Sequence, residues 1–358
     1  MGFIKAIFNA LADPRYFFTL AVVSLAVLVW KRERVASNSF GYGLLGFLAV
    51  FFIFGVFDAN FRLIVTKPDN VPIVGLIFLL VFFVWYSLRE GVLNDRRITA
   101  GEGPIEKAES DRVWVWPDLV YTELISLIVC SVVLIVWSIF LKAPLEQPAN
   151  PANTPNPSKA PWYFLGLQEM LVYFDPWLAG VVLPTLIIVG LICIPYIDKN
   201  PKGNGYYTFT ERKAEITIFL FGFAVLWSSL IVLGTFLRGP NWNFFGPFEF
   251  WDIHKLEALT NVNLSEYVWV RAFGTTLPTA WYVREIFGIL LVLFYVLALP
   301  VLLARSVFKS YYDKMGPPRY YVGAFLFVMM MALPIKMLCR WLFNLKYIVA
   351  IGEFFFNI

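Results

Sequence analysis

One glutamate follows an aromatic step in the stretch SKAPWYFLGLQEM, residues 158–170, and it could do proton chemistry. Glu169 stands seven residues after Trp162 and eight after Pro161, a spacing that places all three on one face of a helix. A positioned carboxylate is one of the side chains that can act as a general base. The other interpretation is an amphipathic connector whose glutamate points to water, and the spacing alone leaves both open.

Further charged residues stand at the ends of apolar stretches. Asp118 and Glu123 are five residues apart, so they do not share a helix face. Charges in or beside a membrane span are costly and often functional, and a helix-start charge at the membrane interface is the other interpretation of Asp118. Lys336 and Arg340 lie four residues apart near the end of the last apolar stretch, where snorkelling to the membrane surface explains both.

Histidine and cysteine limit the metal chemistry of the chain. His254 is the only histidine, and Cys130, Cys193 and Cys339 are far apart without CxxC spacing. Ligand count excludes a covalently attached c-type haem, an iron–sulfur site and a two-histidine b-type haem within this chain alone. We therefore predict no metal site, small buried hydrophobic roles for the cysteines and a solvated loop position for His254.

The elements that carry these residues are apolar stretches long enough to cross a bilayer. Of the 358 residues, 59% are hydrophobic and 15% charged, and a spanning helix needs roughly 17–25 residues. The fold class predicted is all-α: a polytopic integral membrane protein with about eight transmembrane helices plus an interfacial helix in an outer loop. The expected spans are 16–30, 41–57, 72–88, 119–141, 177–197, 214–237, 286–304 and 320–338.

Lysine and arginine gather in alternate loops, which predicts the orientation of the chain. The loops after residues 30, 88, 197 and 304 are rich in these residues and should face the cytoplasm. The long segments 142–176 and 239–285 are poor in them for their length and should face the outer side. This bias accounts for the net charge of +4 without a nucleic-acid partner.

Composition divides the chain into four parts. Residues 1–90 hold the N-terminal spans and residues 91–117 a charged inner loop. Residues 118–238 form a central core, and residues 239–358 combine an aromatic outer loop with the last spans. The stretch FFGPFEFWD in that outer loop suggests a contact surface for partners.

From Trp116 to Gly239 the chain resembles the C-terminal part of cytochrome b, in the split form known as subunit IV of cytochrome b6f complexes. The resemblance rests on WPDLVY entering a span, QPANPANTPNP in place of the Pro/Asp-rich ef loop, PWYF where the family carries Pro-Glu-Trp-Tyr, and a span ending IPYID. The ef loop would be 142–176. The spans outside this region look like those of extended C-terminal cytochrome b subunits of some bacterial bc complexes.

The resemblance implies a haem-free membrane subunit of a proton-translocating quinol–cytochrome c oxidoreductase, not catalytic alone, in the electron transport of a respiratory chain. It implies menaquinol or ubiquinol as the quinone, with haem b and a Rieske 2Fe–2S cluster on partner subunits. Those partners would be a haem-bearing cytochrome b N-terminal subunit, a Rieske iron–sulfur protein and a c-type cytochrome, in a dimeric complex surrounded by membrane lipids. The location implied is the bacterial cytoplasmic membrane, with 142–176 and 239–285 on the periplasmic side.

In that family the motif walls the outer quinol-oxidation site, and its glutamate takes a proton from the quinol. Here proline occupies the glutamate position, and proline cannot accept a proton. We therefore predict that Glu169 is the catalytic base. The quinone-binding residues expected from the resemblance are Pro161, Trp162, Tyr163 and Gly166, and the possible inner-side proton-uptake residues are Asp118 and Glu123.

Three alternatives stay open at this point. The chain could be a haem-free quinone-binding anchor of another respiratory or photosynthetic oxidoreductase. It could be a secondary transporter, although no convincing inverted repeat is visible. It could also be a scaffold whose quinone site has decayed, an option that the missing motif glutamate keeps open.

Overall fold

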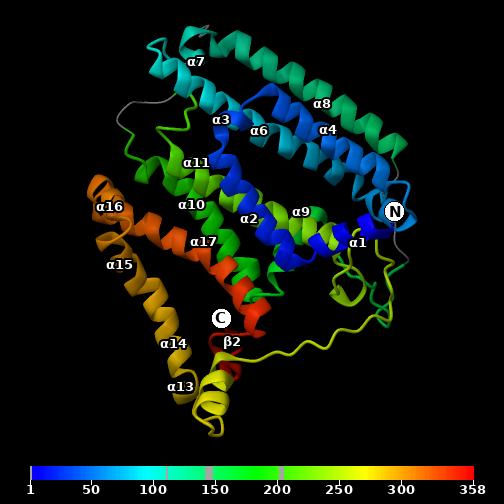
Figure 1. Cartoon of the computed structure of the whole chain (residues 1–358), viewed down its shortest axis with the longest axis vertical. Helices are drawn as coiled ribbons and strands as arrows, with labels where there is room; N and C mark the ends of the chain where they lie inside the picture. The colour runs from blue at the N-terminus through cyan, green and yellow to red at the C-terminus, as the bar shows by residue number, and fades with distance from the viewer. Residues whose placement is uncertain (1, 110–111, 142–147, 201–204) are drawn as a thin grey trace. The chain divides into compact units, whose positions relative to one another are not determined.

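The computed structural model describes residues 2–109, 112–141, 148–200 and 205–358 (Figure 1). Predictions that fall elsewhere, including the first six residues of the 142–176 loop, lie outside the described residues. Most of the described chain is α-helical, and its short strands β1 (Ala350–Ile351) and β2 (Phe356–Asn357) pair antiparallel. The predicted all-α polytopic fold is confirmed.

Seven helices in the described ranges are long and apolar enough to cross a membrane. They are α4 (Asn38–Gly55); α6 (Val71–Thr99); η1 (Val115–Leu119) with α8 (Val120–Phe140); η2 (Leu178–Val182) with α10 (Leu183–Ile197); α11 (Lys213–Leu220), η3 (Phe221–Trp227), α12 (Ser228–Val232) and η4 (Leu233–Leu237); α14 (Ile286–Leu293), η7 (Phe294–Ala298) and α15 (Leu299–Arg305); and α17 (Pro317–Phe343).

The first predicted span is half of a bent pair. Helices α1 (Gly2–Leu11) and α2 (Pro14–Trp30) differ in direction by 77°, and together they would make an eighth span. The Asp13 carboxylate caps α2 by accepting a hydrogen bond from the Arg15 amide at 3.0 Å, and Pro14 has the φ angle that suits a first helical residue. A new helix therefore starts at this point instead of continuing α1.

Two π-helical segments each end two residues before a proline. Segment η2 is followed by Pro184 and segment η7 by Pro300, each two residues beyond the segment's end. Proline has no amide hydrogen, and its ring clashes with the carbonyl four residues earlier in a regular helix. A wider turn before each proline removes that clash without ending the span.

The chain divides into two compact units. The first comprises Met1–Ser158, Asn204–Val225 and Thr235–Lys255. Besides its spans it contains α3 (Arg32–Val35), α5 (Ala59–Val65), α7 (Ile105–Ala108) and η5 (Pro240–Trp242). In this unit α4 packs on α6, and a Cβ atom at Gly41 would lie 2.1 Å from Trp85 Cε2, so only glycine permits the contact.

The C-terminal end of α6 continues past the apolar stretch and holds two loops together. Asn94 is fully buried, and its Nδ2 donates to the Tyr207 carbonyl oxygen at 2.9 Å and to Glu106 Oε2 at 2.8 Å. Asn94 Oδ1 accepts from the Ile105 amide at 2.9 Å. One amide side chain thus joins the 91–108 and 205–212 segments of the first unit.

The aromatic stretch after residue 243 packs mainly inside the first unit. Phe245 is buried, and the Phe248 ring stacks on Phe61 with centroids 5.1 Å apart. The Phe248 amide also donates to Asn9 Oδ1 at 2.9 Å. The expectation that this stretch forms a partner surface is therefore wrong for Phe245, which packs on Trp251 and Lys255 of its own segment. The half-buried Phe248 packs partly on the N-terminal helices.

The second unit comprises Lys159–Gly203, Leu226–Gly234 and Leu256–Ile358. It adds α9 (Trp162–Met170), η6 (Glu266–Ala272), α13 (Trp281–Arg284), α16 (Lys309–Met315) and η8 (Gly352–Phe354). Helix α10 packs on α17, and Figure 1 shows α15 and α17 meeting at α16, from which α14 and α17 diverge. Tyr295 and Tyr320 fasten this hairpin by donating to the carbonyl oxygens of Val328 at 2.7 Å and Pro300 at 3.0 Å.

Candidate functional site

The predicted short helix in the outer loop exists as α9. It begins at Trp162 directly after Pro161, whose extended backbone forms the cap. Gln168 Oε1 accepts a hydrogen bond from the Ala160 amide at 2.9 Å, which holds the incoming chain against the helix. With nine residues, α9 is only about 13 Å long and cannot cross a bilayer.

The two ends of one face of α9 differ sharply in exposure. Glu169 has no exposed surface, whereas Trp162 is 38% exposed and Tyr163 is 51% exposed. Seven residues make about 700° of helical rotation, so Trp162 and Glu169 share a face within roughly 20° and lie about 10 Å apart along the axis. The interpretation in which Glu169 points to water does not agree with this structure.

Two glycines bring α9 close to the helix that contains α12. A Cβ atom at Gly166 would lie 3.3 Å from Ile231 Cγ1, and one at Gly234 would lie 3.0 Å from the Leu165 carbonyl oxygen. Gly166 therefore acts as a packing residue on the buried side of α9. At 100° per residue, Gly166 lies on the helix face that also carries Trp162 and Glu169, between the two along the axis.

The chain after α9 is fastened by the C-terminal tail, residues 344–358. The Tyr347 hydroxyl donates to Asp175 Oδ1 at 3.1 Å, and Asn357 Nδ2 donates to the same oxygen at 3.3 Å. Trp177 Nε1 donates to the Asn357 carbonyl oxygen at 2.9 Å, and its ring stacks on Phe356 with centroids 5.0 Å apart. We call these five side chains the tail clasp.

Sequence reasoning missed the tail clasp. Asp175 and Tyr347 are 172 positions apart, and neither stands in a motif. Burial first, and then the bond to Asp175, raise the pKa of the Tyr347 phenol, so it remains a hydrogen-bond donor at neutral pH. A group whose folded-state pKa is raised contributes stability below its ordinary pKa near 10 and loses that contribution as the pH rises further.

Lys336 and Arg340 are not snorkelling residues, and that expectation is wrong. Lys336 is 2% exposed and Arg340 is 9% exposed, both within α17. Lys336 Nζ donates to the Lys346 carbonyl oxygen at 2.6 Å, and Arg340 Nη1 donates to the Asn344 carbonyl oxygen at 3.2 Å. Both cations turn toward the start of the C-terminal tail because its free carbonyl groups lie there.

Asp118 and Glu123 belong to the first unit, whereas Glu169 belongs to the second. Both side chains are exposed. In the span formed by η1 and α8, Val120 is half-buried and every other residue is exposed. No described residue forms a hydrogen bond or ion pair with either carboxylate group. Their predicted part in proton uptake stays a prediction.

The structure also bears on histidine and cysteine. His254 is exposed in a loop, as expected. Cys130 is exposed, and Cys193 and Cys339 are half-buried, so the prediction of buried cysteines is wrong for this chain by itself. Among the residues that the structure describes, no three His, Cys, Asp or Glu side chains gather in a way that could hold a metal ion.

Comparison with known proteins finds a family match for the segment that contains α9. Residues 148–245 match the family described as Cytochrome b(C-terminal)/b6/petD. The chain carries a cytochrome b C-terminal-like segment. This segment includes Pro161, Trp162, Tyr163, Gly166 and Glu169, while the N-terminal spans and the last two spans lie outside it.

A second similarity, to a whole protein, covers a longer stretch of the chain. The chain is 28% identical over 171 residues to a cytochrome b of Allochromatium vinosum, which covers 43% of this chain and 41% of that protein. The chain thus spans about two fifths of the length of the relative it matches. No solved structure matches the chain.

Proposed function

We propose that this chain is a membrane subunit of a bc-type quinol–cytochrome c oxidoreductase and forms part of its outer quinol-oxidation site and proton exit. The proposal rests on the burial of the Glu169 carboxylate. Glu169 has no exposed surface and lies on the α9 face that begins at Trp162, inside the cytochrome b C-terminal-like segment. Buried carboxylates of this kind are suited to proton transfer with a bound substrate.

The haem groups would belong to partners. His254 is the only histidine and lies exposed in a loop, so the chain's own residues do not fit a b-type haem held by two histidines. A haem-bearing cytochrome b N-terminal subunit and a Rieske iron–sulfur protein would supply the electron acceptors, and a c-type cytochrome would follow. Menaquinol or ubiquinol would be the substrate.

The chain's own residues would bind the quinol and receive its proton. Oxidation of a quinol to a quinone releases two electrons to the partners' acceptors and two protons. The exposed rings of Trp162 and Tyr163 offer an aromatic surface to the quinol ring. Glu169, about 10 Å further along the helix, would accept one proton through a chain of hydrogen-bonded water molecules. Pro161 cannot take that proton and would fix the start of α9 instead.

On the opposite side of the membrane, Asp118 and Glu123 would take part in proton uptake. Both stand in the first turns of the η1–α8 span and are exposed. Release of protons outside and uptake inside would contribute to the membrane potential. The long segments 142–176 and 239–285 would then lie in the periplasm of a bacterial cell.

Replacing Glu169 by glutamine in the native complex tests the proposal. Loss of a positioned general base lowers turnover by roughly 100-fold or more, so we expect quinol:cytochrome c turnover to fall by at least about that factor. The pH profile should change as well. Glu109→Gln, an exposed glutamate in the inner loop, is the control and should leave turnover unchanged. Unchanged turnover and pH profile in Glu169→Gln would reject the proposed base.

A spectrum of the purified native complex separates this proposal from the alternative of another quinone-linked anchor. A b-type haem band together with a Rieske signal supports the bc-type complex, whereas a different redox module supports the anchor. The presence of Pro161 at the motif's glutamate position specifically favours a third possibility, a scaffold without quinol chemistry. Partner cofactors with no quinol turnover in the intact complex would favour the scaffold.

A further inference from the structure

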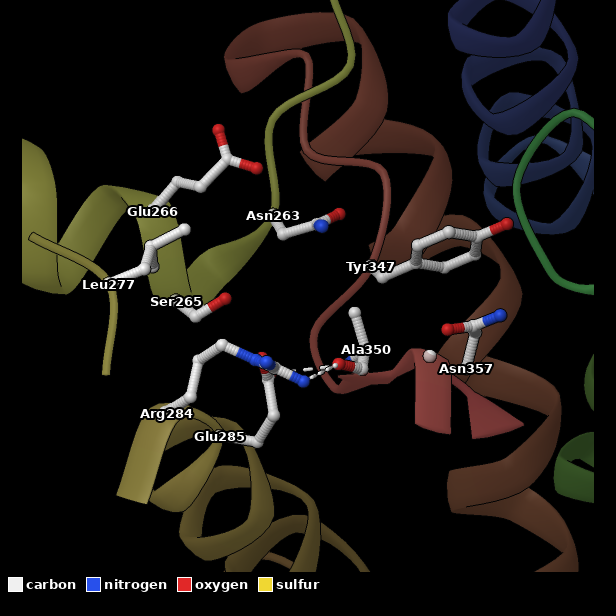
Figure 2. A pocket seen from close by; sticks show the side chains of 10 residues that line it. Asn263, Ser265, Glu266, Leu277, Arg284, Glu285, Tyr347, Ala350 and Asn357 are labelled. Atoms are coloured by element: carbon white, nitrogen blue, oxygen red, sulfur yellow. Dashed lines mark hydrogen bonds and ion pairs between the residues drawn. The ribbon is translucent and has the colours of Figure 1, made fainter. Parts of the chain in front are cut away.

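A pocket of about 330 Å³ with several polar side chains in its lining lies in the second unit (Figure 2). It is lined by residues 263–277 of the long loop, by Arg284 and Glu285, and by the C-terminal tail. Arg284 ends α13, and α14 begins two residues later at Ile286. The tail follows the last residue of α17, Phe343. The pocket therefore lies where two antiparallel spans end on the same side.

Aromatic side chains surround this end of the two spans. Trp269 contacts Phe273 and Phe287 with ring centroids 5.6 and 5.7 Å apart, and Trp281 contacts Phe354 at 5.9 Å. Tryptophan and other aromatic residues gather at the level of the lipid headgroups. A ligand in the pocket would thus lie at the depth of a headgroup.

Arg284 and Glu285 are charged lining residues with partners in the second unit, whereas Glu266, also in the lining, has no ion pair among the described residues, and Figure 2 shows its carboxylate turned away from Arg284. Arg284 Nε lies 3.1 Å from Glu285 Oε1, and its Nη2 lies 2.9 Å from Glu353 Oε2. Glu285 is 2% exposed, and its second oxygen accepts a hydrogen bond from the Ala350 amide at 3.1 Å. An anionic group would have to displace one of these carboxylates, so the pocket favours an uncharged ligand.

Two polar side chains that line the pocket have no hydrogen-bond partner among the residues that the structure describes. Ser265 is 5% exposed, and no described residue hydrogen-bonds its hydroxyl group. The Asn263 amide group likewise makes no hydrogen bond to the residues described. Figure 2 shows the Ser265 hydroxyl group directed toward the space between Arg284 and Tyr347, whereas the Asn263 amide group lies beside Tyr347 on the side away from Arg284 and the Asn357 amide group lies below the Tyr347 ring. Buried polar groups normally have partners, so a ligand is the expected partner here.

We propose that this pocket binds an uncharged, hydroxyl-rich headgroup, a sugar or glycerol unit, of a lipid in the adjoining leaflet. Hydroxyl groups both donate and accept, as do Ser265 and the two asparagine amide groups, so neighbouring hydroxyls of one ligand match all three. The pocket holds a single such unit, and the acyl chains would remain outside along α14 and α17. The proposal does not depend on quinol oxidation.

A photoreactive alkyl glucoside tests the proposal on the full chain purified in phosphatidylcholine nanodiscs. After irradiation, mass spectrometry should find most labelling in the peptides that contain 263–277 and 347–357. An unreactive alkyl glucoside should compete, whereas an alkyl phosphocholine of the same chain length should not. Equal competition by both headgroups would overturn the proposal.

Variants and a soluble competitor sharpen the test. Loss of one hydrogen-bond partner should lower labelling of these peptides about fivefold in Ser265→Ala and in Asn263→Leu. Ser131→Ala, on the exposed face of α8, serves as the matched control and should not change labelling. If free glucose competed as well as the alkyl glucoside, the ligand would be a soluble polyol, and the lipid assignment would be overturned.

Discussion

Lys336 is a cation in the interior of the second unit. Its ammonium group donates to one carbonyl oxygen, that of Lys346, and lies 5.8 Å from the centre of the Phe174 ring. No carboxylate among the described residues forms an ion pair with it. Removing an ammonium group from water costs several kcal/mol, and one neutral acceptor with one ring face recovers only part of that cost.

Replacing Lys336 by methionine tests whether the charge stabilises the fold. Methionine has a similar length and no charge, so it removes the desolvation cost and leaves one carbonyl oxygen without its donor. We expect the free energy of unfolding in detergent to rise, or to fall by less than about 1 kcal/mol. Lys309→Met, at the start of the peripheral helix α16, controls for loss of a lysine. Destabilisation by about 3 kcal/mol or more would mean that the ammonium group holds the tail in place.

Among the elements, the C-terminal tail connects parts of the chain that are far apart in sequence. Its Lys346 amide donates to the Val262 carbonyl oxygen at 2.8 Å, and the Tyr347 carbonyl oxygen accepts from the Leu264 amide at 2.9 Å. A Cβ atom at Gly288 would lie 2.0 Å from the Ile348 carbonyl oxygen, so the tail lies directly on the start of α14. Through Asp175 it also fixes the segment that follows α9.

Tyr347→Phe removes one hydrogen bond of the tail clasp without changing its shape. A single side-chain hydrogen bond contributes about 1 kcal/mol, which corresponds to an approximately fivefold change in an equilibrium constant. We expect the amides of Leu264 and Lys346 to exchange about fivefold faster with deuterium than in the wild type. Tyr282→Phe, at an exposed tyrosine, should leave these rates unchanged. Equal rates in the wild type and Tyr347→Phe would show that Asp175 does not restrain the tail.

The elements that could be predicted from sequence are those whose signal is local. Seven spans follow from continuous apolar stretches, and α9 follows from a helical pattern after a proline. The bend at Asp13 has a local cause, a capping carboxylate followed by proline. A search for apolar stretches alone does not predict it. Patterns along the chain therefore give the elements and most of their boundaries.

Side-chain environments could not be predicted in the same way. Lys336 faces a carbonyl ten residues further along the chain, and Phe248 packs on Phe8 and Phe61, about two hundred residues earlier. The burial of Glu169 depends on the approach of Gly166 to Ile231, which is also a long-range contact. Such pairs carry no signal in one sequence, because each partner alone is compatible with solvent or lipid.

At the scale of the whole molecule, the seven spans fix which segments share a side of the membrane. If each span crosses once, the segments after α4, α8, η4 and α17 lie on one side, and those after α6, α10 and α15 lie on the other. The second group contains the lysine- and arginine-rich loops. Because positively charged loops remain in the cytoplasm, we propose that the 142–176 and 239–285 segments are periplasmic.

Single-cysteine labelling of intact cells tests this orientation. In a variant whose three native cysteines are replaced by alanine, Asn153→Cys and His254→Cys should react with a membrane-impermeant maleimide before lysis. Glu109→Cys and Asp313→Cys, in the charged loops, should react only after lysis, and all four positions are exposed or half-buried, so access to the reagent is comparable. The reverse pattern would place the α9 loop in the cytoplasm. Protons released near Glu169 would then enter the cell, which is incompatible with an outer quinol-oxidation site and would reject the proposed function together with the orientation.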